Sequence, residues 1–310
     1  MNTPVIRAEN LSRFYGIVLG LNNVSFEIRP GITGVVGPNG SGKTTLFRLL
    51  TGQISPSSGR IEVFGAVPWS NPAVLARIAY CPENEAVPAA LRPLDWLVAL
   101  GQLSGLSARE SRSRGTAALE RVRLAPEHWK KPVAKFSKGM KQRVKLAQCL
   151  LHEPQLIILD EPMNGLDPMG REDFSAVLRQ LAARGTSVLI SSHILHDLEA
   201  LCSAFILLRH GRIPRASNEA ASAEARRRWP AATTIRCDDP RALARFLFDQ
   251  DLIRGCDIAS DTGTLHVHWS DSDRFHADPH GILLASGVAI REVRSTASFL
   301  ERAVEPTLTP

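Results

Sequence analysis

The sequence predicts an α/β protein that is built on a doubly wound parallel sheet and carries a smaller second domain. The run "GITGVVG" has the pattern of a strand that leads into a glycine-rich loop. "QLIILD" and "TSVLISSH" are continuous apolar runs, which are typical of parallel strands covered on both faces. The helical pattern of "REDFSAVLRQLAARG" lies between these two runs, and such alternation predicts crossover connections.

The elements on either side of this core follow in order. The first 36 residues alternate short β-prone runs with turn residues, which predicts several strands. From Pro93 to about His128 the pattern is helical, and "PLDWLVALGQL" opens with a proline suited to a first helical turn. We therefore expect a helical insert, at about residues 84–130, between two α/β halves.

The last third of the chain reads as a separate module. Residues 216–230 are rich in Ala, Ser and charge and predict a helical linker between a first domain (residues 1–215) and a C-terminal accessory domain (residues 231–310). The accessory domain has strand and helix patterns in the order β-α-β-β-α-β, which predicts a small ferredoxin-like α+β fold. Leu265, Val267 and Trp269 alternate strictly along one of its expected strands.

The amino-acid composition is that of a globular protein. The chain has 310 residues, of which 44% are hydrophobic and 22% charged, and a net charge of +6, values ordinary for a globular protein. Five dispersed cysteines predict reduced thiols in a cytosolic compartment. We identify no signal peptide, and the apolar runs fall short of the roughly 20 residues that span a bilayer, so we expect no membrane crossing.

The strongest motif is "GPNGSGKTT", which fits the pattern G-x-x-x-x-G-K-[ST] between a strand and a helix. Its glycines let backbone N–H groups surround phosphate oxygens, and the helix N-terminus adds positive potential. Lys43 is expected to reach the β- and γ-phosphates and Thr44 to ligate Mg²⁺. The predicted nucleotide-binding residues are Gly37, Pro38, Asn39, Gly40, Ser41, Gly42, Lys43, Thr44 and Thr45.

The segment "LIILDEP" supplies the second half of a nucleotide site. Asp160 stands at the carboxyl end of an apolar strand, where an aspartate can hold the Mg²⁺ shell. Glu161 follows it and is suited to orient or deprotonate the attacking water. Together with Lys43, these two acids predict ATP hydrolysis.

Four further motifs occur in an order that resembles the ATP-binding subunits of ATP-binding cassette (ABC) transporters, over about residues 4–215. "FSKGM" resembles the signature loop of that family, with Ser137 standing 23 residues before Asp160. "NGLDP" resembles the D-loop, and "ISSHIL" resembles the switch-histidine segment. "SRFYG" is similar to the segment that stacks an aromatic ring on adenine. The resemblance implies a P-loop NTPase (RecA-like) core with an antiparallel β subdomain and a helical subdomain.

The resemblance also implies roles for individual residues. Tyr15 would contact adenine, with neighbouring Phe14 as the alternative; His193 would sense the γ-phosphate. Asp167 belongs to the D-loop. In the family the signature loop, here Ser137 and Gly139, closes on the nucleotide of the opposite subunit in a head-to-tail dimer. Ser137 is also a suitable N-cap for the helix that follows, which would direct free N–H groups outward toward an anion.

Two departures from the family pattern affect this interpretation. Glu83 in "AYCPENEA" stands where the family commonly has a glutamine, and an acid there can bind Mg²⁺ or its water shell but adds negative charge near the phosphates. Thr44, Asp160 and Glu83 are therefore the expected metal ligands. Lys138 and Met140 replace the usual signature residues, and the resulting S-K-G-M resembles exporter-type ATPases of the antibiotic and multidrug group.

We therefore predict an ATPase that uses ATP and Mg²⁺ to power a separate integral membrane permease, most simply an exporter. The expected catalytic residues are Glu161, His193 and Lys43. The expected partners are a permease, contacted by the helical insert and the Glu83 loop, and a second copy of the chain or a related ATPase subunit. The resemblance places the protein at the cytoplasmic face of the membrane, held there peripherally through the permease, with no nucleic acid as a partner.

The alternatives belong to other classes. A soluble ABC-type ATPase acting on nucleic acid or the ribosome usually carries long insertions or two cassettes, whereas Lys43 and Asp160 are only 117 residues apart here. A P-loop kinase should lack "FSKGM" and the acid pair, and a non-hydrolysing subunit should lack Glu161 or His193. His193 and His196 have the spacing of a metal pair, but no cysteine or acidic ligand set surrounds them.

Overall fold

The computed structural model describes residues 3–84, 87–213, 232–259, 263–270, 274–275 and 278–296. The chain divides into two compact units, Met1–Ala221 and Ser222–Pro310. The predicted linker at residues 216–230 lies outside the described residues. Within the described part, no helix has both the length and the apolar character that crossing a bilayer requires, and no disulfide joins the five cysteines.

The centre of the N-terminal unit is a five-stranded parallel sheet in the order β5-β6-β7-β3-β8. All residues of β3, β6 and β7 are buried, which explains why apolar residues predominate in their sequences. Because β6 and β7 are parallel neighbours, the residues that follow their carboxyl ends lie side by side. The strands are β3 (Ile32–Val36), β5 (Ile78–Cys81), β6 (Leu156–Leu159), β7 (Ser187–Ser191) and β8 (Ala204–Leu207).

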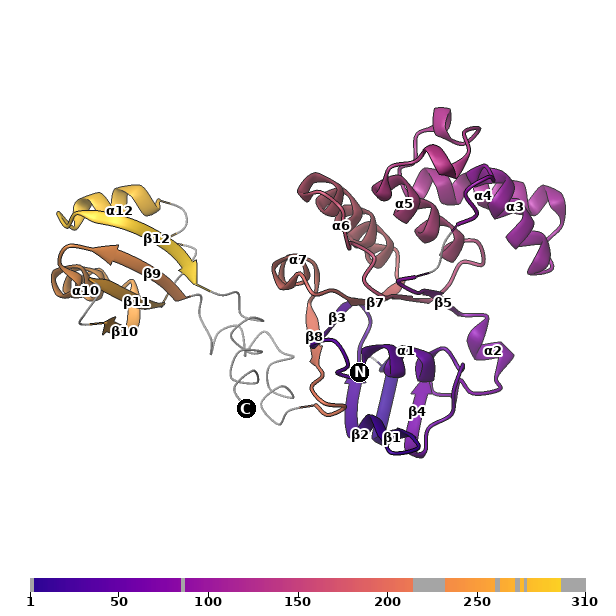
Figure 1. Cartoon of the computed structure of the whole chain (residues 1–310), viewed down its shortest axis with the longest axis horizontal. Helices are drawn as coiled ribbons and strands as arrows, with labels where there is room; N and C mark the ends of the chain where they lie inside the picture. The colour runs from indigo at the N-terminus through magenta and orange to yellow at the C-terminus, as the bar shows by residue number, and fades with distance from the viewer. Residues whose placement is uncertain are drawn as a thin grey trace. The chain divides into compact units, whose positions relative to one another are not determined.

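A second sheet, antiparallel and in the order β2-β1-β4, forms the predicted β subdomain. Its strands are β1 (Ile6–Tyr15), β2 (Val18–Ile28) and β4 (Ser58–Val63). Helix α1 (Lys43–Leu50) buries Leu46, Phe47 and Leu50 in a core shared with both sheets. Figure 1 shows α1 on one side of the parallel sheet, and α5, α6 and α7 on the other.

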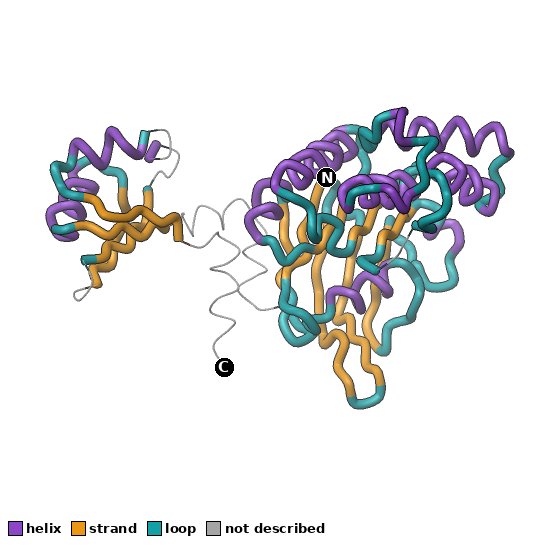
Figure 2. The backbone as a smooth tube through the Cα atoms, turned by 45° about the horizontal axis from the view of Figure 1, so that its top comes forward, coloured by secondary structure: helices purple, strands orange, loops and turns teal. Residues whose placement is uncertain are grey.

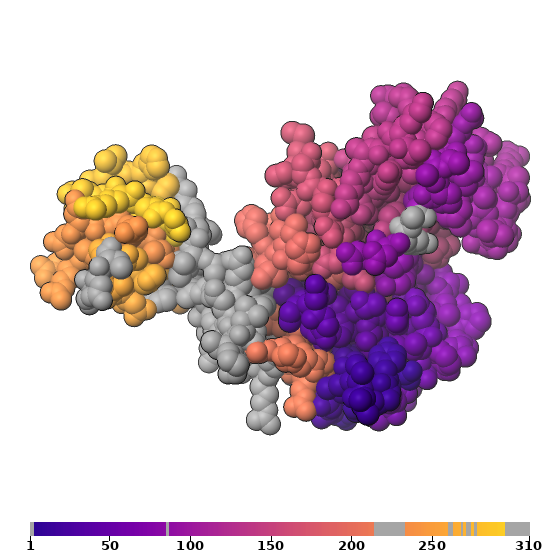
Figure 3. Space-filling view, viewed as in Figure 1, coloured from indigo at the N-terminus to yellow at the C-terminus, as the bar shows by residue number. Residues whose placement is uncertain are grey.

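The predicted helical insert is present and forms a lobe distinct from the antiparallel sheet (Figure 3). Its first long helix starts at a proline, and its second starts at a capping box in which Ser107 and Glu110 bond each other's backbone N–H groups. Figure 2 shows the strands of this unit with helices packed along them. The remaining helices are α2 (Pro72–Leu75), α3 (Pro93–Leu103), α4 (Ala108–Arg121), α5 (Lys138–Cys149), α6 (Pro168–Ala183), α7 (Leu195–Leu201), and the short 3₁₀ helices η1 (Pro126–His128) and η2 (Val133–Lys135).

The C-terminal unit has the β-α-β-β-α-β order that the sequence predicts, with an antiparallel sheet in the order β10-β11-β9-β12. The alternating residues Leu265, Val267 and Trp269 are fully buried in its core. The Trp269 ring stacks on Phe275 at 4.0 Å between centroids, and its indole N–H donates to Thr233 Oγ1 at 2.7 Å. The elements are β9 (Ala232–Cys237), α10 (Pro240–Asp249), β10 (Ile253–Ala259), β11 (Thr264–Trp269), α12 (Pro279–Ala285) and β12 (Ile290–Thr296).

Candidate active site

The glycine-rich loop joins β3 to α1 and requires glycine at specific positions. Gly40 and Gly42 have φ angles of +78° and +109°, which side-chain-bearing residues rarely adopt. A Cβ atom at Gly37 would collide with the carbonyl oxygen of Leu208. No side chain caps the N-terminus of α1, so its first N–H groups remain available to a ligand. The loop is therefore shaped as an anion-binding turn.

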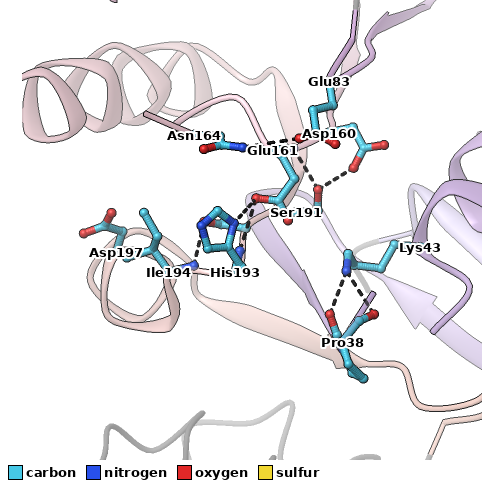
Figure 4. Close-up of polar contacts among 12 residues, drawn as sticks. Pro38, Lys43, Glu83, Asp160, Glu161, Asn164, Ser191, His193, Ile194 and Asp197 are labelled. Atoms are coloured by element: carbon cyan, nitrogen blue, oxygen red, sulfur yellow. Dashed lines mark hydrogen bonds and ion pairs between the residues drawn. The ribbon is translucent and has the colours of Figure 1, made fainter. Parts of the chain in front are cut away.

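Lys43 brings a positive charge to the centre of this loop. Its Nζ donates to the carbonyl oxygens of Gly37 at 2.6 Å and Pro38 at 3.3 Å, so the side chain folds back over the loop (Figure 4). The hydroxyl of Ser41 is buried and has no hydrogen-bond partner among the described residues. An incoming phosphate would give both groups an oxygen to bond.

A pocket of about 280 Å³ opens beside the loop, and we call it the nucleotide pocket. Tyr15 lines this pocket and Phe14 does not, so the structure favours the tyrosine as the aromatic contact. Gly37 and Pro38 are not among its lining residues, but their carbonyl oxygens accept from the Lys43 ammonium group. The lining residues are Tyr15, Val18, Leu19, Gly20, Asn39, Gly40, Ser41, Gly42, Lys43, Thr44, Thr45, Glu83, Asp160 and Glu161. Sequence reasoning missed Val18, Leu19 and Gly20, whose only signal was their place just after the aromatic residue.

The two acids are fixed by one serine that the sequence analysis did not assign. Ser191, at the end of β7, donates its hydroxyl to Asp160 Oδ1 at 2.7 Å. The same hydroxyl accepts from the backbone N–H of Glu161 at 2.9 Å. Glu161 has a φ of +49°, a left-handed conformation that is uncommon for glutamate. The available signal was that Ser191 ends a strand that neighbours the Asp160 strand.

The carboxylate of Glu161 also contacts the predicted sensor histidine. Glu161 Oε2 lies 2.8 Å from Nδ1 of His193 and accepts from the backbone N–H of His193 at 3.2 Å (Figure 4). The Glu161 side chain is 10% exposed and the His193 side chain 60% exposed. Glu161 is therefore held in place on the protein side, whereas the imidazole faces outward, where a ligand can reach it.

Burial raises the pKa of Asp160 above its ordinary value. The hydrogen bond from Ser191 opposes this shift, and the negative charges of Glu161 and Glu83 add to it. Thr44 Oγ1 lies 3.5 Å from Asp160 Oδ2. A divalent cation bound here would offset the concentrated negative charge, and hydroxyl and carboxylate oxygens are the donors that Mg²⁺ prefers.

The protein oxygen atoms at this site could hold Mg²⁺ only together with oxygen ligands from a substrate. The described residues contain no cluster of three or more His, Cys, Asp or Glu residues placed to hold a metal ion. Mg²⁺ is commonly bound through one or two carboxylates together with waters and substrate phosphates. Thr44, Asp160 and Glu83 would meet that requirement from one wall of the nucleotide pocket. The carboxylate of Glu83 accepts from Asn164 Nδ2 at 3.3 Å.

The signature residues lie on a different surface. Ser137 caps α5 by accepting the backbone N–H of Met140 at 3.3 Å, and Asp167 caps α6 by accepting that of Gly170 at 2.6 Å. Both caps, with Lys138 and Gly139, line a separate hollow of about 680 Å³, which we call the signature surface. None of the residues that line the nucleotide pocket lines the signature surface.

Comparison with known proteins places this geometry in a family. The sequence profile of the ABC transporter family matches residues 21–164. The ABC transporter ATP-binding protein YxlF of Bacillus subtilis (strain 168), which is uncharacterised, is 37% identical over 210 residues, 67% of this chain and 69% of that protein. The chain belongs to the ABC transporter ATP-binding family. It is therefore a subunit that binds and hydrolyses ATP to power a membrane permease.

Other relatives agree with this assignment. Nod factor export ATP-binding protein I of Rhizobium johnstonii (strain DSM 114642 / LMG 32736 / 3841) is 37% identical over 213 residues, which cover 68% of each chain. A solved ATP-binding subunit of an ABC transporter superposes with a TM-score of 0.59 and 32% identity, covering 67% of this chain and 88% of that one. These relatives are ABC proteins, and they give no support to an ATPase acting on nucleic acid or the ribosome.

Proposed function

We propose that the chain is the ATPase of an exporter and works as a head-to-tail dimer, with a second copy or a related subunit, at the cytoplasmic face of a membrane. Export is supported by the similarity to a Nod factor export protein and by the S-K-G-M signature. The helical insert and the Glu83 loop are the proposed contact with the permease. Glu83 suits this role because it lines the nucleotide pocket and borders the insert.

The dimer proposal rests on the separation of the nucleotide pocket from the signature surface. The nucleotide pocket contains the phosphate loop and the acid pair but none of the signature residues. The signature surface contains two helix N-termini and Lys138 but no glycine-rich phosphate loop. Each surface would form half of an ATP site. A phosphate could be stabilised both by the N–H groups of the phosphate loop and by those of the signature helices only if the signature surface of a second chain faced the nucleotide pocket of the first.

The acid pair accounts for hydrolysis. Glu161 is proposed as the general base for the attacking water, with its carboxylate held by His193 and its backbone by Ser191. Lys43, from the loop, and the capped helix end at Ser137, from the partner, would stabilise charge on the γ-phosphoryl group. Mg²⁺, when bound by Thr44, Asp160 and Glu83, supplies further positive charge to the β- and γ-phosphates.

The proposal is tested by Glu161→Gln. This substitution removes the base but keeps the size of the side chain, so hydrolysis should fall by at least about 100-fold. ATP binding should persist, and ATP should drive a stable dimer that size-exclusion chromatography detects. Glu120→Gln, an exposed change on α4, is the matched control and should retain full activity. Normal turnover by Glu161→Gln would show that another residue is the base.

A further inference from the structure

Helix α5 carries a buried lysine in addition to the exposed lysines near the signature loop. Lys145 is 5% exposed. Lysine is almost never fully buried unless its ammonium group has partners, since desolvating a charge is costly. The Lys145 ammonium group donates to the carbonyl oxygens of Pro82 at 2.8 Å and of Glu83 at 3.0 Å. The side chain therefore joins α5 to the loop that follows β5.

This loop supplies one wall of the nucleotide pocket. Glu83 lines the pocket, and its carboxylate is held by Asn164 at 3.3 Å. Glu83 is thus attached at two points, through its backbone to Lys145 and through its side chain to Asn164. Asn164 itself lies three residues after Glu161 and three before Asp167.

The other end of the lysine's helix reaches the signature surface. Ser137 caps α5 eight residues before Lys145, a distance of about 12 Å along a helix axis. Val144 and Leu146, on either side of Lys145, are 0% and 1% exposed, so the middle of the helix is packed against the core, whereas its first turn at Lys138 is exposed. A helix packed in this way transmits a displacement of one end to the other.

We propose that Lys145 is a positioning residue that fixes the Glu83 loop to the signature helix, α5. Movement of this loop on nucleotide binding would then reorient the signature residues that meet the partner's nucleotide. Lysine suits the role because its long stem crosses the interior and its compact charge can bond two carbonyl groups at once. The inference rests on the dimeric ATPase proposed above and adds the residue that links its two half-sites.

The test uses Lys145→Met in the full chain, with Glu161→Gln added to trap the dimer. Methionine keeps most of the length of the stem but removes the donors, so the carbonyl oxygens of Pro82 and Glu83 lose this partner. The thermal unfolding temperature should therefore fall, so dimerisation is measured well below it, and ATP binding to the monomer without Mg²⁺ should be unchanged. The protein concentration needed for ATP-dependent dimerisation should rise about 10-fold, the effect of losing a hydrogen bond to a charged group. Lys131→Met, an exposed change, is the matched control in the same background.

A second measurement separates positioning from general stability. Amide hydrogen exchange in a peptide covering residues 78–84 should be faster in Lys145→Met than in the Lys131→Met control. If Lys145→Met fails to fold, Asn164→Ala removes the other attachment of Glu83 and should weaken dimerisation in the same direction. Dimerisation and exchange equal to those of the control would overturn the inference. Failure of Glu161→Gln alone to dimerise with ATP would instead count against the proposed function.

Discussion

Serine and acidic residues are important in both the nucleotide pocket and the signature surface, but the acid pair and its serine are buried at the pocket, whereas the two helix caps are exposed on the signature surface. In the nucleotide pocket Asp160 and Glu161 are 7% and 8% exposed, and a shared serine hydroxyl fixes both. On the signature surface Ser137 and Asp167 are exposed, and each accepts one backbone N–H of its own helix. The first surface is organised by contacts within the chain, whereas the second consists of two capped helix N-termini that are exposed to solvent.

Among the substitutions that test this contrast, Ser191→Ala is expected to have the largest effect, which is a loss of ATPase activity or Mg²⁺ affinity. In Ser191→Ala the acceptor for the Glu161 N–H and the donor to Asp160 are both lost in a buried site. Loss of such an outer partner of a metal ligand commonly lowers metal affinity or activity by about 10- to 100-fold. Steady-state ATPase assays over a Mg²⁺ titration would measure this. Ser192→Ala is the control, since the Ser192 hydroxyl accepts the nearby N–H of Ile194; equal losses in both variants would contradict the prediction.

A smaller effect is expected on the signature surface. Ser137→Ala removes the cap of α5 and should lower the free energy of unfolding by about 1 kcal/mol. ATP binding to the monomer should not change, because Ser137 is not part of the nucleotide pocket. Denaturant unfolding and equilibrium ATP binding measure the two quantities, and Ser137→Asn, which keeps a capping acceptor, should restore the stability. Weaker ATP binding to the Ser137→Ala monomer would show that the two surfaces are not independent.

The smallest effect is a pH dependence that belongs to the nucleotide pocket. Because the folded-state pKa of Asp160 is raised above its ordinary value of 3.8, the native state binds this proton more tightly than the unfolded state. The protonated Asp160 carboxyl group therefore contributes to stability at pH values below its unfolded-state pKa, and this contribution is lost as the pH rises through its folded-state pKa. Asp160→Asn should therefore unfold at a higher temperature than the parent protein near neutral pH, by a margin that shrinks as the pH falls toward about 4.

Thermal unfolding of both proteins across this pH range measures the margin. Asp167→Asn, on the signature surface, is the control and should unfold near the parent temperature at neutral pH, because asparagine also caps helices. A margin for Asp160→Asn that stays constant over the whole range would show that the ionisation of this carboxyl group is not its cause.

Most of the architecture was predictable because its signals are local. The loop before Lys43, the apolar strand before Asp160 and the helix cap at Ser137 each depend on residues close in sequence, and each lies where the pattern predicts it. The alternation of Leu265 and Val267 likewise identified a strand with one buried face. The sequence favoured Tyr15 over Phe14 through the family pattern alone, and the structure adds that Tyr15 lines the nucleotide pocket, because adjacent residues on a strand present opposite faces.

The sequence by itself determined the chemistry of this protein: which loop can surround phosphate, which acids follow the buried strand, and which family pattern they match. Only the tertiary structure decided how those groups are held. Ser191 reaches Asp160 from 31 residues away, and Lys145 reaches Glu83 from 62 residues away. Such contacts depend on which strands become neighbours and on which helix face turns inward, and these outcomes follow from burying the apolar surface of the whole domain rather than from any local pattern.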